Sequence, residues 1–121
     1  MKLTTLVSIG FVFLAAPAFA HDAKPLNGGR VIFAGNFHVE LVAKGDVVEV
    51  YLIDHHNKPM SLAGHKGVAI LSVDGKSQRI VLQTADGARL VGKAEGPLPA
   101  EPKAVVQITP PEGKTVQAKF N

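Results

Sequence analysis

The sequence predicts an all-β protein, a small antiparallel sandwich or barrel of about seven or eight short strands. Three observations support this fold class. Apolar and polar residues alternate with the period of two that half-buried strands show. Residues typical of tight turns separate the alternating runs, and no window carries a helical apolar stripe with a cap. Because the runs are short and mostly joined by tight turns, an antiparallel arrangement is favoured.

The clearest pair of strands lies in the first half of the chain. Residues 37–44 alternate in character, with Val39 and Leu41 as apolar members, and residues 47–53 do the same around Val48 and Val50. A turn at Lys44-Gly45-Asp46 joins the two runs. The pattern therefore predicts a hairpin with one apolar face and one polar face.

The remaining strands follow in order along the chain. They are expected at residues 30–34, 67–73, 78–84, 89–93, 103–109 and 115–120. The turns between them are expected at Asp74-Gly75, Asp86-Gly87 and Pro110-Pro111-Glu112-Gly113, whose residues tolerate a positive φ or preset a turn. Residues 96–102 are rich in proline and predict an extended crossover to a final hairpin, because too few residues follow for a second core.

The first hairpin can adopt two registers. Both apolar sets share a face only if paired residue numbers sum to an odd value, such as 89 or 91, since a slip of one residue turns one set outward. The opposite face then carries His38, Glu40, Glu49, Tyr51 and His55. With a sum of 91, His38 faces Ile53 and lies diagonal to His55, about 7 to 8 Å away and within bridging reach of an ion. With a sum of 89 the two histidines lie further apart.

The first twenty residues predict export. Met1 and Lys2 form a positive start, an apolar run follows, and Ala18-Phe19-Ala20 is a pattern that signal peptidase cuts after. The apolar run is shorter than the roughly 20 residues of a membrane span and is followed by Pro17, so cleavage is favoured over an uncleaved anchor. We expect a signal peptide at 1–20, a flexible N-terminal arm at 21–29 and a single β-domain at 30–121, released as a soluble protein without a membrane span.

Composition excludes several function classes. The 121 residues contain no cysteine, which excludes disulfide scaffolds, zinc fingers, iron–sulfur proteins and cysteine nucleophiles. The 13 Lys and Arg against 10 Asp and Glu are scattered, so nucleic-acid binding is not expected. Catalytic sequence patterns are missing, and Glu40 and Glu49 are expected to keep an outer strand face wet rather than to form a catalytic pair. We therefore predict that the protein is not an enzyme.

Histidine and methionine gather between residues 54 and 65. Imidazole binds copper, zinc and nickel, and a thioether favours cuprous ion, so a His and Met set without Cys favours copper, with zinc or nickel as alternatives. The candidate metal ligands are His55, His56, His38 and Met60, with His65 or His21 as auxiliary ligands. The alternative interpretation is structural: His55 and His56 occupy a polar turn, while Met60 and Leu62 enter the core.

His21 becomes the N-terminal residue after the predicted cleavage. Its α-amine and its own imidazole can then close a chelate ring on one ion. The competing interpretation is that His21 begins a mobile arm.

Several short motifs carry a resemblance to a known family. They are Gly28-Gly29-Arg30-Val31, residues 35–42, residues 48–55 and Lys58-Pro59-Met60. Together they resemble a small exported β-domain of Gram-negative bacteria, which occurs alone and within periplasmic adaptor subunits of heavy-metal efflux pumps of the resistance-nodulation-division type. The resemblance implies a periplasmic location and a link to handling metals such as copper, rather than catalysis. Its pattern positions are Gly28, Gly29, His38, Glu40, Tyr51, Asp54, His55 and Pro59.

These observations lead to one expected function and two alternatives. We expect a periplasmic protein that binds a transition metal, copper above all, and serves in metal buffering, resistance or delivery to a periplasmic efflux component. The alternative is a metal-free protein–protein interaction module that docks through a sheet edge or through the loop from His55 to Lys66. A third interpretation, an acid sensor, rests only on the clustered histidines.

Overall fold

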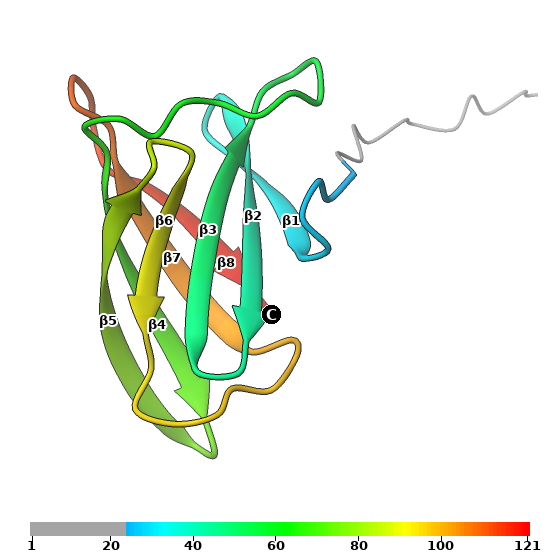
Figure 1. The fold of residues 1–121 in the computed structure, drawn as a ribbon, viewed down its shortest axis with the longest axis vertical. Helices are drawn as coiled ribbons and strands as arrows, with labels where there is room; N and C mark the ends of the chain where they lie inside the picture. The colour runs from blue at the N-terminus through cyan, green and yellow to red at the C-terminus, as the bar shows by residue number, and fades with distance from the viewer. Residues whose placement is uncertain (1–23) are drawn as a thin grey trace, which may run out of the picture.

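Eight antiparallel strands and no helix make up residues 24–121, the part of the chain that the computed structural model describes. The strands are β1 (Arg30–Ala34), β2 (Phe37–Lys44), β3 (Val47–Ile53), β4 (Lys66–Val73), β5 (Lys76–Ala85), β6 (Arg89–Lys93), β7 (Lys103–Thr109) and β8 (Val116–Phe120). Their order is β1-β2-β3-β6-β5-β4-β7-β8, and they curl into a nearly closed barrel (Figure 1). The predicted fold class is confirmed. Between residues 24 and 121, no helix has the length and apolar character needed to cross a membrane.

The first hairpin adopts the register that sums to 91. His38 pairs with Ile53 and Lys44 with Val47, which leaves Gly45 and Asp46 as a two-residue loop. Gly45 has a φ of 60°, a conformation that glycine adopts without steric cost. This register brings the turn that follows β3 alongside the start of β2.

The core fills the inside of the barrel. Alternate residues of every strand point inward, and among the largest fully buried side chains are Leu52, Leu71, Leu90, Ile108 and Phe120. Phe120 belongs to the last strand, so the C-terminal end of the described chain is built into the core. The apolar alternation that predicted the strands is therefore the pattern that fills the barrel.

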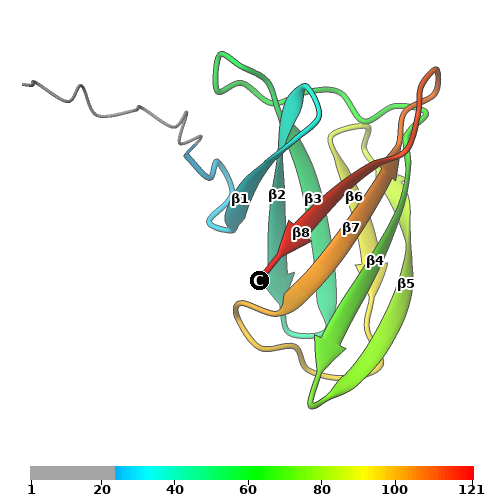
Figure 2. The same cartoon turned by 180° about the vertical axis from the view of Figure 1, so that it is seen from behind.

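A seam between the two edge strands, β1 and β8, is bridged by one side chain. Arg30 donates hydrogen bonds to the backbone oxygens of Pro102 at 2.9 Å and Asn121 at 2.7 Å. Its guanidinium carbon lies 5.5 Å from the centroid of the Phe120 ring, a cation–π distance. Figure 2 shows β1 and β8 lying next to each other on this side of the molecule.

Two long connections cross the ends of the barrel. Residues 54–65 leave β3, form a projecting turn and then run over one end to reach β4 (Figure 1). Residues 94–102 cross the other end, from β6 to β7, and β7 and β8 form the final hairpin. The segment rich in histidine thus occupies one end of the barrel.

Candidate functional site

The outward face of β2 and β3 collects most of the polar residues singled out in the first hairpin. Register places His38 opposite Ile53, Glu40 opposite Tyr51, and Val42 opposite Glu49. The inward side of the same strands carries core residues such as Val39 and Val50. The predicted assignment of faces along these two strands is confirmed.

Glu40 is buried, so the expectation that it keeps this face wet is wrong. Its side chain is 0% exposed. Its carboxylate accepts backbone hydrogen bonds from Leu26 at 3.0 Å, Asn27 at 2.9 Å and Gly29 at 2.8 Å, and one from the Asn27 side-chain amide at 3.1 Å. Glu40 therefore serves as an anchor that holds residues 26–29 against β2. The first residues of the predicted arm, 21–23, lie outside the described residues.

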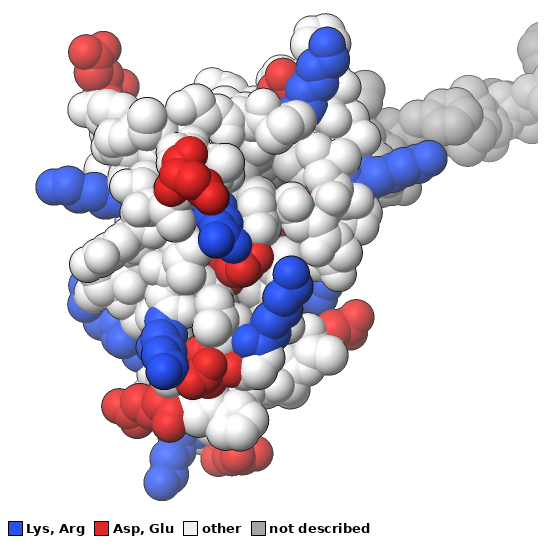
Figure 3. Space-filling model, in the orientation of Figure 1, with Lys and Arg blue, Asp and Glu red and all other residues white. Residues whose placement is uncertain are grey.

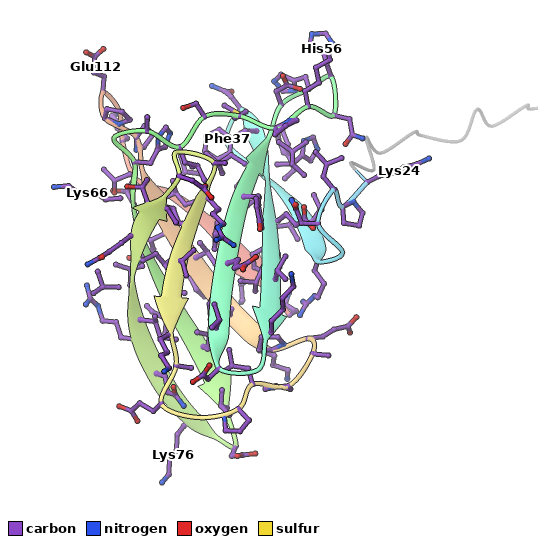
Figure 4. The ribbon with its side chains drawn as sticks, in the orientation of Figure 1. Lys24, Phe37, His56, Lys66, Lys76 and Glu112 are labelled. Carbon is purple, nitrogen blue, oxygen red and sulfur yellow. The ribbon has the colours of Figure 1, made fainter. Side chains whose placement is uncertain are left out.

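Glycine at position 29 makes this docking possible. A Cβ atom added there would lie 2.3 Å from the Leu41 carbonyl oxygen and 2.8 Å from Cγ2 of Val42. Because the first of these is a backbone atom that cannot swing aside, only glycine lets the arm approach β2 this closely. Figure 4 shows Lys24, just before the docked residues, pointing away from the barrel.

Glu49 is also buried, at 7% exposed, and the expectation of a wet face is wrong for it as well. Its carboxylate accepts a hydrogen bond from the Tyr51 hydroxyl at 2.7 Å and forms an ion pair with Arg89 at 2.9 Å. Both carboxylate oxygens thus have partners within the fold. This arrangement links β3 to β6.

Tyr51 provides a spectroscopic test of this network. Burial raises the pKa of Tyr51 above its ordinary value of 10.0, and the hydrogen bond to Glu49 raises it further. The raised pKa means that the folded state favours the protonated Tyr51 hydroxyl. The contribution of Tyr51 to the free energy of unfolding is therefore complete below pH 10 and is lost as the pH rises through the raised pKa. Tyr51 is the only tyrosine and the chain has no tryptophan. An absorbance titration of tyrosinate should therefore give one transition with a midpoint above 10.

Glu49→Gln should move that midpoint downward, because the neutral amide removes the negative charge beside the hydroxyl. Circular dichroism along the same titration checks that the barrel stays folded. A midpoint at or below 10 in the folded wild type would contradict the network.

His38 is the most unusual side chain on this face. It is 5% exposed, and neither ring nitrogen has a hydrogen-bond partner among residues 24–121. The Phe33 ring lies beside it, with centroids 5.2 Å apart and a tilt of 59°. The same Phe33 ring lies 6.4 Å from the ring of His55. His38, Phe33 and His55 therefore form one aromatic cluster, which we call the histidine cluster.

The turn after β3 presents His55 and His56. The Asp54 carboxylate accepts hydrogen bonds from the backbone N–H groups of His56 at 2.8 Å and Lys58 at 2.9 Å. The bond from Lys58, with a smaller effect from His56, lowers the pKa of Asp54 below 3.8. Both histidines are exposed, and Figure 4 shows His56 at the tip of the turn. Asp54 thus shapes the turn that holds His55 beside Phe33.

The other candidate ligands lie elsewhere. Met60 packs against the barrel core and Leu62 is fully buried, as the structural interpretation of this segment expected. The ring of His65 lies near the far end of the segment, with Nδ1 3.2 Å from the Ala63 carbonyl oxygen. Figure 4 shows the neighbouring Lys66 on the side of the barrel away from His56. His21 lies outside the described residues.

The structure places two of the predicted ligands, His38 and His55, near the same Phe33 ring, and His56 follows His55 in sequence. Within residues 24–121, no group of three His, Asp or Glu side chains is arranged to hold a metal ion. Sequence reasoning missed the part played by Phe33. Its position directly opposite His38 across β1 and β2 would have been the signal, once that pairing was known.

Comparison of the chain with family models, with curated proteins and with solved structures gave no match.

Proposed function

We propose that the protein binds a transition-metal ion, copper in preference to zinc or nickel, through His38 and His55. The observation that carries this proposal is the buried His38 ring, whose two nitrogens have no partner among the described residues. His56, one residue from His55, is a further donor at the same turn. In this proposal the ion is held at the histidine cluster, and the protein buffers it or delivers it to a periplasmic efflux component.

Burial of an unpartnered polar group is costly. Leaving a buried donor or acceptor unsatisfied costs about 1–3 kcal/mol, and native proteins leave few such groups. A metal ion bound to one ring nitrogen of His38 would satisfy that atom. Phe33, at 60% exposed, packs beside the buried ring. The histidine cluster therefore contains ring nitrogens that are available to bind an ion.

The chemistry of the donors favours copper. Imidazole suits copper, zinc and nickel, and among divalent ions of the first transition row affinity is greatest for copper. Met60 packs on the core side of the barrel, so its thioether is not counted as a ligand here. The exposed His55 and His56 suit exchange of the ion with a partner, since ligands at the surface are accessible to an incoming donor. The predicted signal peptide supports the periplasmic setting.

The test is a metal titration of the protein purified after export, with its N-terminus verified by mass spectrometry. Cupric ion is followed by EPR, and cuprous ion is measured against a competing chelator. We expect one tightly bound ion with nitrogen hyperfine structure. His38→Ala alone, and His55→Ala with His56→Ala, should each lower the affinity at least tenfold.

Matched controls are His65→Ala and Met60→Leu, which alter candidate ligands away from the histidine cluster and should leave the affinity within about twofold. Circular dichroism of each variant checks the fold. The proposal fails if the wild type binds no more tightly than the urea-unfolded chain, or if a folded His38→Ala variant keeps its affinity. Zinc and nickel titrations decide the preference for copper.

A further inference from the structure

The outward face of β4, β5, β7 and β8 is cationic. Alternation along these strands turns Lys66, Arg79, Lys103 and Lys119 outward, and all four are exposed. The outward residues of these strands include no carboxylate; Asp74 and Glu112 belong to the connecting turns at their ends. Figure 2 shows the four strands side by side as the near layer of the barrel. We call this surface the basic face.

Charge is distributed differently on the other side of the molecule. Figure 3 looks at the barrel from the opposite direction, and there acidic and basic side chains are interspersed. Ion pairs on that side include Arg89 with Glu49 and Lys93 with Asp46. The four exposed cations of the basic face have no ion-pair partner among residues 24–121, and they would attract an acidic partner.

The basic face is also hollowed. A depression of about 730 Å³ lies over β4, β5 and β7, lined in part by His65, Lys66, Arg79, Gln83, Gln107 and Thr109. A second, separate depression of about 240 Å³ is lined in part by Lys103 and Lys119. Amide and hydroxyl groups line the larger depression, so it offers both donors and acceptors beside its cations.

Apolar residues cross the middle of the basic face. Val68 pairs with Val81, and Ile70 pairs with Val105. Val81 is 58% exposed, which is unusual for a large apolar side chain of a strand. The pair of Ile70 and Val105 has a cation on each side, because Arg79 pairs with Ile70 and Lys119 pairs with Val105. The surface therefore alternates cationic, amide and apolar contacts at the spacing of strands.

We propose that the basic face binds an extended acidic segment of a partner protein. Carboxylates of the segment pair with Lys66 and Arg79, its main chain bonds the amides and hydroxyls of the larger depression, and its apolar residues cover Val68 and Val81. The spacing of cationic, amide and apolar groups along the strands favours an extended peptide chain over a membrane surface, because an extended chain presents alternate side chains with the same period. This interaction needs no metal.

The test uses a fluorescent peptide that alternates glutamate with valine, and measures anisotropy at low salt with EDTA present. We expect saturable binding that weakens as salt rises, because screening reduces the ionic contribution. The double variant Lys66→Glu with Arg79→Glu should lower the affinity at least tenfold. Lys24→Glu with Lys44→Glu makes the same change in net charge away from the basic face, and should change the affinity by less than about threefold.

Three outcomes would overturn the proposal. One is absence of peptide binding, and another is equal loss in the two double variants, which would indicate a nonspecific effect of net charge. The third is binding to vesicles of phosphatidylglycerol without binding to the peptide, which would identify a lipid surface instead. Peptide binding by His38→Ala should equal that of the wild type, so failure of the metal proposal and failure of this one are separate results.

Discussion

Glu40→Ala is expected to lower the free energy of unfolding by about 2 to 4 kcal/mol. The carboxylate is fully buried and accepts hydrogen bonds from three backbone N–H groups and one side-chain amide of residues 26–29. A hydrogen bond to a charged group contributes about 1.5–3 kcal/mol, and the total stays below the sum because the detached segment regains water. Urea denaturation at pH 7 measures the loss.

Hydrogen exchange gives a second measurement on the same variant. The amides of Leu26, Asn27 and Gly29 should lose protection, since their acceptor is gone. The matched control is Glu112→Ala, which removes an exposed carboxylate from the turn between β7 and β8 and should change stability by less than about 0.5 kcal/mol. Equal stability of the two variants, with protection retained in both, would show that Glu40 does not anchor the segment.

Phe120→Ala is expected to cost about 3 to 5 kcal/mol, as truncation of a buried phenylalanine does in other cores. Phe120 is 1% exposed although it is the penultimate residue of the chain. The control is Phe33→Ala, the same chemical change at a side chain that is 60% exposed, which should cost less than about 1 kcal/mol. Urea denaturation of both variants compares them directly. Similar losses would mean that β8 does not complete the core.

Arg30 extends this prediction to the seam. Arg30→Ala removes two hydrogen bonds to backbone oxygens and the contact with the Phe120 ring, and should cost about 1 to 3 kcal/mol. Because Arg30 and Phe120 touch, the double variant should lose less than the sum of the single losses. If the loss of stability in the double variant equals the sum of the two single losses, the Arg30 contacts across the seam and the packing of Phe120 are energetically independent.

The site and the fold share one strand. β2 pairs with β1, which carries Phe33, and with β3, which leads into the turn of His55. The Glu40 anchor lies on the same outward face as His38. We therefore expect Glu40→Ala to be a structural variant whose metal affinity is interpreted only after its folded fraction is known.

The sequence by itself determined the strands, the turns and the faces of the first hairpin. Residues 30–34, 89–93 and 103–109 are strands as predicted, and the Asp-Gly turns have the positive φ expected of them, 51° at Asp74 and 50° at Asp86. These features depend on neighbouring residues alone. Alternation decides which side a strand residue takes, and turn residues decide where a strand ends, so local pattern is sufficient.

Only the tertiary structure decided what each outward residue does. Glu40 accepts from residues 11 to 14 positions earlier, and Glu49 pairs with Arg89, 40 positions later. Two registers bury the same apolar face, and the folded structure has the one that sums to 91, which sets His38 opposite Ile53; pairing of β1 with β2 sets Phe33 beside His38. The alternation of apolar and polar residues predicts that a residue faces outward. Its neighbours, whether water, a carboxylate or an aromatic ring, belong to segments that are distant in the chain and become adjacent only in the folded barrel.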